Sequence, residues 1–292
     1  MKQPVIAGIG EVLWDIYPDA AHFGGAPANF ASHAAMLGAE SWMVSAVGAD
    51  PHGDKALRAL SDLGVNTDTV VRDPDHATGQ VLVTLDGQGV PRYEIALDSA
   101  WDHLAWSADL DAFAERCDAV CFGTLAQRSP DSRVTIRRFV EAVPRDALRI
   151  FDVNLRQPFY DRDTIDLSLR GASAVKLNAE ELPVVAQLLG LGHQTEGGLL
   201  RQLMDIYDLR LAALTRGPKG ALLLDDRADD DCPAPRTVVV DTVGAGDAFT
   251  ASLVVDFLRG LPLSEINRRA NALASRVCSQ PGGTPARAAR PT

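Results

Sequence analysis

The chain has 292 residues and a formal net charge of −11, with 46% hydrophobic and 23% charged residues. This composition is typical of a soluble globular protein, and the excess of acid excludes a broad positive surface for nucleic acid or anionic membranes. No apolar run approaches the roughly 18 residues of a membrane span, and the opening stretch, broken by Pro4, is too short for a signal sequence. We therefore expect a cytoplasmic protein whose four cysteines are free thiols.

The first half of the chain alternates between strand and helix patterns. Residues 5–10 and 41–47 are short apolar runs that predict buried strands. Helices are predicted over 27–37, which opens on a proline and stops at a glycine, and over 51–63. This order predicts a mainly parallel sheet with helices on both faces.

A hairpin pattern interrupts that alternation. Residues 80–85 and 92–97 are strand-like and are joined by the turn sequence at 86–89. Tightly joined strands cannot be parallel neighbours, so we expect a small separate sheet. It would comprise residues 11–20 and 78–97 and form a lid over the main body.

The alternation resumes after residue 117. The predicted strands are 118–122, 148–153, 174–177 and 211–215, and the predicted helices are 130–143, 180–189, 198–207, 245–259 and 264–279. An antiparallel pair, 221–224 with 237–240, is expected around the acidic run 225–231, which we interpret as a solvated turn. Without a long linker or internal repeat, residues 1–292 are expected to form one α/β domain.

The sequence DTVGAGDAFT places a glycine-rich turn before a helix. Gly244, Ala245 and Gly246 would present free N–H groups at the positive end of that helix, which suits an anion. The Gly-Lys-Ser/Thr of a P-loop is absent, and Asp247 follows instead. Taken alone, this pattern is equally consistent with a helix that simply begins with an acid.

Polar side chains elsewhere predict a pocket for a hydroxylated ligand. Asn29 follows the small residues 24–28 at another helix start, and Asp15 is an acid within an apolar run. Further polar residues follow predicted strands, whose carboxyl ends gather ligands in open α/β sheets. These residues are Asp152, Asn154, Arg156, Asn178, Glu181, Thr215, Gly217 and Gly220. Asn178 and Glu181 share a helix face and could orient water around Mg²⁺.

Together these motifs resemble those of the ribokinase-like (PfkB) carbohydrate kinases. The segments that carry this resemblance are 24–29, 241–247, Asn178-x-x-Glu181 and Thr215-x-Gly217-x-x-Gly220. They occur in the family's order over nearly the whole chain. Residues 10–15, 122–128 and 152–156 are most similar to bacterial fructokinases. The resemblance implies a three-layer αβα sandwich with a mainly parallel central sheet and a small β-sheet lid.

The resemblance also implies roles for individual residues. Asp247 would take the proton from the sugar's primary hydroxyl, while Gly244, Ala245 and Gly246 surround the transferring γ-phosphoryl group of ATP. Sugar contacts are implied for Asp15, Gly25, Asn29 and Arg156. Nucleotide contacts are implied for Asn178, Thr215, Gly217, Gly220 and Asn271. Glu181 would hold Mg²⁺ through water, and a K⁺-type ion is implied beside Asp241 and Val243.

Several activities remain open at this point. Fructose to fructose 6-phosphate is the leading reaction, with 2-keto-3-deoxygluconate, ribose and nucleosides as alternative substrates. A sugar acid would want an additional cation in the lid or at Arg156, and the hairpin offers only Arg92. A nucleoside would want an aromatic clamp, which Trp14, Phe23 and Trp101 could supply. A non-catalytic sugar-binding regulator would have lost the base or the anion-binding turn, and both are present. We further expect a homodimer formed through the lid.

Overall fold

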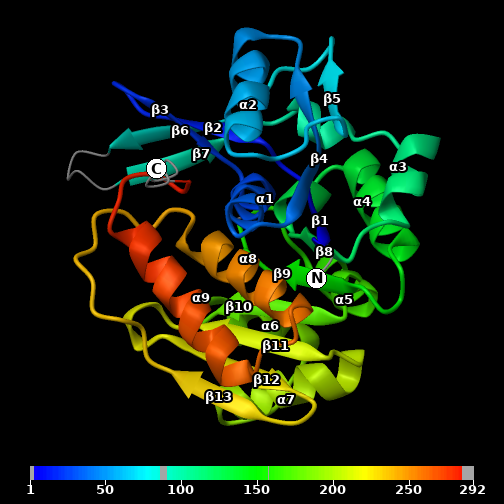
Figure 1. The fold of residues 1–292 in the computed structure, drawn as a ribbon. Coiled ribbons are helices and arrows are strands. Elements are labelled where there is room, and N and C mark those ends of the chain that lie inside the picture. Colours follow the sequence, from blue (N-terminus) through cyan, green and yellow to red (C-terminus); the bar gives the residue numbers. More distant parts are fainter. Residues whose placement is uncertain (1–2, 86–90, 157, 285–292) are drawn as a thin grey trace.

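A nine-stranded sheet runs through the centre of the computed structural model, which describes residues 3–85, 91–156 and 158–284 (Figure 1). Its strands are β1 (Val5–Ile9), β4 (Glu40–Gly48), β5 (Val70–Asp73), β8 (Ala119–Phe122), β9 (Leu148–Asp152), β10 (Ala174–Asn178), β11 (Leu211–Thr215), β12 (Ala221–Asp225) and β13 (Asp229–Cys232). They are ordered β13-β12-β11-β10-β9-β8-β1-β4-β5. Neighbours from β11 to β5 are parallel, so their carboxyl ends share one edge.

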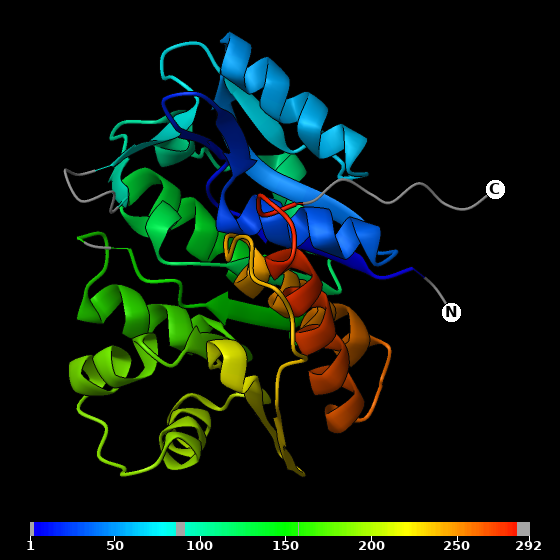
Figure 2. The same cartoon turned by 90° about the vertical axis from the view of Figure 1, so that its left-hand side faces the viewer.

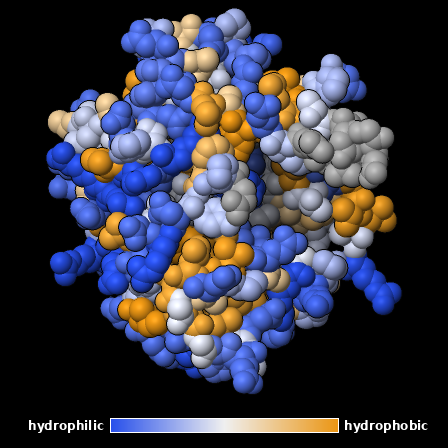
Figure 3. Space-filling view, turned by 180° about the vertical axis from the view of Figure 1, so that it is seen from behind, coloured by the Kyte–Doolittle hydropathy of each residue, from blue (hydrophilic) through white to orange (hydrophobic). Residues whose placement is uncertain are grey.

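Helices cover both faces of this sheet (Figure 2). One face carries α1 (Ala26–Met36), α2 (Pro51–Asp62), α8 (Ala245–Leu258) and α9 (Leu263–Cys278). The other carries α3 (Ala108–Ala114), α4 (Pro130–Ala142), α5 (Arg162–Gly171), α6 (Glu181–Leu189) and α7 (Glu196–Tyr207). The predicted αβα arrangement is therefore confirmed. Seen from behind, hydrophobic residues on the surface lie in separate patches among hydrophilic ones (Figure 3).

The core explains why the parallel strands are continuous apolar runs. Every residue of β1 is buried, with Ile6 in the cluster under α1 and α8 and Ala7 in the cluster on the opposite face. A strand covered on both sides gains from apolar residues at every position rather than at alternate ones. Short 3₁₀ helices η1 (Ala100–His103), η2 (Leu125–Gln127) and η3 (Gly217–Lys219) occupy connections around this core.

The predicted small sheet is confirmed and has one strand more than expected. Its strands are β2 (Leu13–Ile16), β3 (Ala21–Gly24), β6 (Gly79–Leu85) and β7 (Pro91–Ile95), in the order β3-β2-β6-β7. β2 pairs with β6 in parallel, so the segment at 11–17 joins the hairpin as expected. Sequence reasoning missed β3, because its exposed Ala21 and His22 give no apolar pattern. The predicted turn at 86–89 lies outside the described residues.

The predicted late antiparallel pair was partly wrong. β12 forms as expected and pairs antiparallel with β11 on one side. On its other side the partner is β13 rather than 237–240, and β13 begins within the acidic run that we had interpreted as a turn. Residues 237–240 form no strand and leave Val238 82% exposed. Aspartates on this edge strand have partners, since Asp231 pairs with Arg216 and Asp230 accepts hydrogen bonds from Asn267. Those partners are distant in sequence, so local charge patterning could not reveal them.

Candidate active site

A pocket of about 600 Å³ lies where the carboxyl ends of the parallel strands, the start of α8 and the small sheet meet. Asn178 and Thr215 line it from the ends of β10 and β11, and Asp247 lines it from the first turn of α8. Asp15 on β2 and Tyr93 on β7 contribute the opposite wall. The pocket is therefore assembled from segments spread over most of the chain.

The turn before α8 requires glycine at its first position. Gly244 has a φ of 74°, and a Cβ there would lie 2.4 Å from the Cα of Gly283. Gly246 is less confined, because a Cβ there would approach only the amine at the end of the Lys176 side chain, at 3.0 Å. The first N–H groups of α8 lie at its positive end and have no acceptor within the helix. The Ala245 N–H donates to the carbonyl of Thr242 at 3.3 Å, while Gly244 and Gly246 line the pocket. The turn can therefore hold an anion there.

Asp247 is half-buried beside that turn and keeps one strong hydrogen bond. Asn29 of α1 donates from Nδ2 to Asp247 Oδ2 at 2.8 Å. Burial raises the pKa of Asp247 to about 6, as does Asp152, while Asn29, Lys176 and Arg156 oppose the rise. A carboxylate with a pKa near 6 is ionised at neutral pH and still basic enough to accept a proton.

A buried ion pair supports the turn from below. Lys176 Nζ lies 3.0 Å from Asp152 Oδ1, and Thr250 of α8 donates from Oγ1 to Asp152 Oδ2 at 2.9 Å. Burial lowers the pKa of Lys176, but Asp152, Glu181 and Asp247 outweigh it and raise the pKa overall. Sequence reasoning did not single out Lys176. A lysine inside the apolar run AVKL was the signal that could have identified it.

Glu11 is a second acid that the sequence analysis did not assign to the site. It follows β1, is 3% exposed and lines the pocket. Its Oε1 accepts from the Ala26 N–H at 3.3 Å, whereas Oε2 is buried without a partner among the described residues. Burial raises the pKa of Glu11 to about 7, with a further contribution from Asp247. Glu11 is thus close to half-protonated at neutral pH and can then donate a hydrogen bond.

The predicted ligand-binding side chains flank these acids. Burial raises the pKa of Asp15 to about 6, and His22 and Arg156 oppose the change. Arg156 is exposed and lines the pocket, with its guanidinium donating to the carbonyl of Leu155. Asn154 lines it from a left-handed conformation with a φ of 40°, which asparagine tolerates better than most residues. Hydroxyl groups of a ligand would find both donors and acceptors here.

Asn178 and Glu181 come together, as their spacing predicted, but Glu181 is held by the protein. Its two oxygens accept from the N–H groups of Leu155 and Asn178 at 2.9 and 2.8 Å. Asn178 Oδ1 in turn accepts from the N–H of Glu181. Burial raises the pKa of Glu181, and Lys176 lowers it. Because both oxygens already accept backbone hydrogen bonds, Glu181 is poorly placed to bind a metal ion directly. Each oxygen keeps a lone pair that can accept from water, which fits Mg²⁺ held through its waters.

The predicted residues divide into two groups by position. Those that line the pocket are Asp15, Gly25, Asn29, Arg156, Asn178, Thr215, Val243, Gly244, Gly246 and Asp247. The others lie outside its lining: Ala245, Glu181, Gly217, Gly220, Asp241 and Asn271. Asn271 is buried in α9 and donates to Asn267 on the same helix. Asp241 accepts from the N–H groups of Val243 and Gly282, so it joins two loops beside the turn.

This arrangement can combine proton removal with charge stabilisation. An ionised acid adjoins a set of N–H donors, so a hydroxyl placed at Asp247 could lose its proton while negative charge is stabilised at the turn. No helix among the described residues has both the length and the apolar character needed to cross a membrane.

Comparison with known proteins gives a consistent result. The model of the pfkB family of carbohydrate kinases matches residues 20–289. An uncharacterized sugar kinase of Pyrococcus horikoshii is 31% identical over 290 residues, which cover 93% of this chain and 89% of the other. Its structure in complex with ATP aligns at 30% identity with a TM-score of 0.81, over 96% of this chain and 94% of that one.

Two further relatives are named as fructokinases. That of Salmonella typhimurium is 30% identical over 267 residues, covering 87% of this chain and 85% of the other. The structure of a Vibrio cholerae fructokinase with fructose, ADP and calcium bound has a TM-score of 0.82 at 23% identity. It covers 97% of this chain and 95% of that one, and at this identity it shows a shared fold alone.

Proposed function

This chain belongs to the pfkB family of carbohydrate kinases, and from that premise we propose that it phosphorylates D-fructose at its primary hydroxyl, using ATP to give fructose 6-phosphate. The observation that carries the proposal is the placement of Asp247, held by Asn29, beside the Gly244 turn in the pocket. A base and an anion-binding turn are the two protein groups that phosphoryl transfer to a hydroxyl needs.

Asp247 acts on the attacking hydroxyl in this mechanism. Its carboxylate accepts the hydroxyl proton as the oxygen bonds to the γ-phosphorus, and ADP leaves from the opposite side. The N–H groups of Gly244, Ala245 and Gly246 stabilise negative charge on the transferring group, and comparable donors contribute about 3–4 kcal/mol each. Lys176 lies below the turn and adds a fixed positive charge.

The proposal also assigns residues to ATP and to two ions. Thr215, Gly217 and Gly220 border the nucleotide, and Asn178 and Glu181 hold the waters of Mg²⁺, with Asn271 near the adenine. When bound, Mg²⁺ neutralises charge on the phosphates. A K⁺-type ion beside Asp241 and Val243 would support the adjoining turn.

The lining of the pocket leaves the alternative substrates open. Glu11, Asp15 and Asp247 would oppose the carboxylate of a sugar acid, whereas Arg156 and Lys176 line the same pocket and would attract one. Arg92, the cation that the hairpin offered, lies outside the residues with described side chains.

The aromatic candidates for a nucleoside clamp do not line the pocket, because Trp14 packs edge-on against Phe23 and Trp101 is fully buried. Tyr17 and Tyr93 do line it and offer aromatic rings in their place. Support for fructose among the alternatives therefore comes from the fructokinases that this chain resembles.

A substrate panel tests this proposal. ATP consumption, coupled to a spectrophotometric readout, is measured with fructose, ribose, 2-keto-3-deoxygluconate, tagatose and adenosine. We expect the highest kcat/KM with fructose, and a higher value for any other substrate contradicts the assignment. Asp247→Asn retains an acceptor for Asn29 and should lower kcat by at least about 10²-fold while sugar and ATP still bind.

We also propose a homodimer, formed through the small sheet in the cytoplasm. Leu82 on β6 and Leu97 just after β7 expose 42% and 71% of their surface, and neither lines the pocket. Light scattering at micromolar concentration should give twice the 31.2 kDa mass of one chain. Leu82→Lys should shift the mass toward one chain, and a wild-type monomer counts against the dimer.

A further inference from the structure

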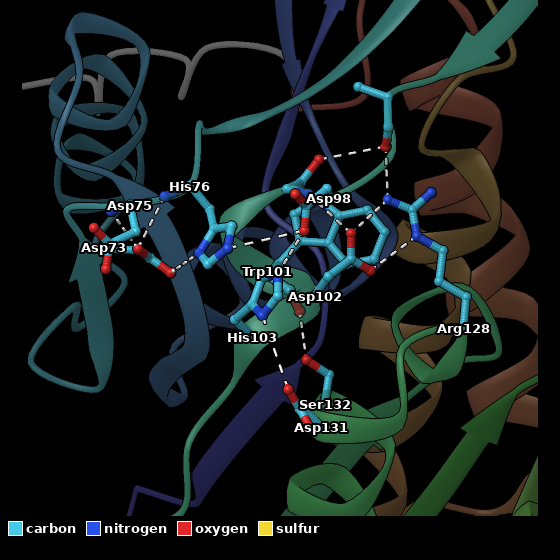
Figure 4. A network of polar contacts seen from close by, with 12 residues as sticks. Asp73, Asp75, His76, Asp98, Trp101, Asp102, His103, Arg128, Asp131 and Ser132 are labelled. Atoms are coloured by element: carbon cyan, nitrogen blue, oxygen red, sulfur yellow. Dashed lines mark hydrogen bonds and ion pairs between the residues drawn. The ribbon is translucent and has the colours of Figure 1, made fainter.

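A second cluster of ionisable side chains lies at the base of the small sheet, outside the lining of the pocket (Figure 4). It consists of His76, Asp98 and His103, which each offer one ligand atom within 4.8 Å of the others. His103 Nε2 lies 2.8 Å and His76 Nε2 3.9 Å from the same oxygen, Asp98 Oδ1. Both Nε2 atoms therefore lie near the same carboxylate oxygen.

A further carboxylate faces the other nitrogen of each imidazole. His76 Nδ1 lies 2.8 Å from Asp73 Oδ2, and His103 Nδ1 lies 3.9 Å from Asp131 Oδ2. Metal-bound histidines in proteins characteristically have their remaining ring nitrogen directed at a carboxylate or carbonyl, which fixes the tautomer that leaves Nε2 free for the ion. The cluster thus contains both the ligands and the groups that orient them.

The charge of the cluster also favours a cation. Three carboxylates, on Asp73, Asp98 and Asp131, surround two imidazoles. Their combined negative charge favours a dication at the nitrogens of the two rings.

The polypeptide around Asp98 is held firmly. Asp98 has a φ of 56°, and the segment that follows it is fixed by Arg128, which pairs with Asp102 at 2.7 Å. The same guanidinium donates to the carbonyl of Ala96 at 2.6 Å and lies 4.0 Å above the ring of Trp101. Because Arg128 is buried, Asp98 and His103 are presented from a rigid segment rather than from a loose loop.

We propose that His76, Asp98 and His103 bind a transition-metal dication of the zinc type. Two imidazoles and one carboxylate, with water in the fourth position, form a familiar ligand set for Zn²⁺, whereas Mg²⁺ prefers oxygen ligands alone. The imidazoles are stacked, with centroids 3.6 Å apart, so one ring must rotate for both nitrogens to face the ion. Both side chains are about 30% exposed and have room to do so.

The site would join the two connections that link the small sheet to the body. His76 precedes β6, and Asp98 and His103 follow β7. An ion bound by all three would tie the entry and exit of the β6–β7 hairpin together. Hydrogen exchange over residues 74–78 and 96–103 should therefore slow when the ion binds.

Calorimetry with the metal alone tests the proposal. Full-length protein without a histidine tag is treated with chelator, dialysed, and titrated with ZnCl₂ and separately with MgCl₂ at pH 7.5, without nucleotide or sugar. We expect one Zn²⁺ per chain and no competition from Mg²⁺. Two variants, Asp98→Asn and His103→Ala, should bind at least about tenfold more weakly. Asn tolerates the left-handed backbone at residue 98, so Asp98→Asn keeps the turn.

His193→Ala provides the matched control, because it removes an exposed imidazole outside the cluster. It should bind Zn²⁺ as the wild type does. The proposal is overturned by absence of stoichiometric Zn²⁺ binding to the wild type, or by equal affinity in the wild type and in Asp98→Asn. Since no step requires turnover, either result leaves the kinase assignment untouched.

Discussion

Replacing Asn29 by Ala should move the acid limb of the kinase pH profile toward higher pH. Asn29 donates at 2.8 Å to the carboxylate of Asp247 and is 3% exposed, so little water can replace the lost donor. A hydrogen bond to a charged group contributes about 1.5–3 kcal/mol, and one pKa unit corresponds to about 1.4 kcal/mol. The pKa of Asp247, now about 6, should therefore rise by roughly 1–2 units.

The assay is kcat at saturating sugar and ATP between pH 5 and 9, which reports ionisation within the substrate complex. The base works only when ionised, so activity is lost as pH falls through its pKa. Wild-type kcat should fall below about pH 6, and Asn29→Ala should fall earlier but recover at high pH. Ser32→Ala, one turn further along α1, is the control and should leave the limb in place. An unshifted limb in Asn29→Ala would refute the coupling, whatever happens to the maximal rate.

Three further substitutions test the architecture of the site. Gly244→Ala should lower kcat and thermal stability far more than Gly260→Ala does. Both glycines have a φ above 70°, but only at residue 244 would a Cβ meet the backbone of Gly283. Equal losses in the two variants would count against the crowding argument. Lys176→Met should lower the free energy of unfolding by about 3–5 kcal/mol, because it leaves Asp152 buried without a counter-charge. Denaturant titrations should show that the double variant Lys176→Met/Asp152→Asn recovers part of this lost stability. Glu11→Gln should stabilise the protein by up to about 3 kcal/mol at pH 8 and make no difference at pH 4. Folding raises the pKa of Glu11 from 4.5 to about 7, so this carboxyl stabilises the fold below pH 4.5 and loses that contribution as the pH rises through 7. A larger effect at pH 4 than at pH 8 would contradict this reasoning.

The sequence allowed prediction of those features that depend on local pattern. The parallel strands, the small sheet and the glycine turn before Asp247 were all visible as runs of residues with a characteristic spacing. The proximity of Asp247 to Asn29, which are 218 positions apart, was implied only by the resemblance to a known family. Whether each residue that lines the pocket serves the predicted role stays a prediction.

The features that were missed depend on contacts between distant segments. Lys176 acquires its place from Asp152 on the neighbouring strand and from Gly246 above it, and none of these is near it in sequence. Glu11 was assigned only as the first residue of the lid segment 11–20, and the surrounding structure makes it a buried acid with a pKa of about 7. β13 forms because β12 offers an edge, although its own aspartates are poor strand formers.

Contact between Gly283 and α1 makes the site depend on a segment that follows α9. His33 Nε2 lies 2.8 Å from the carbonyl oxygen of Gly283, and Gly283 also abuts Gly244. The turn beside Asp247 is therefore braced by backbone that belongs to neither α1 nor α8. A chain cut between α9 and residue 283 would keep its base and its anion-binding turn but lose the brace beside them. Proteolysis at that connection would thus impair the site while leaving both of its central groups in the chain.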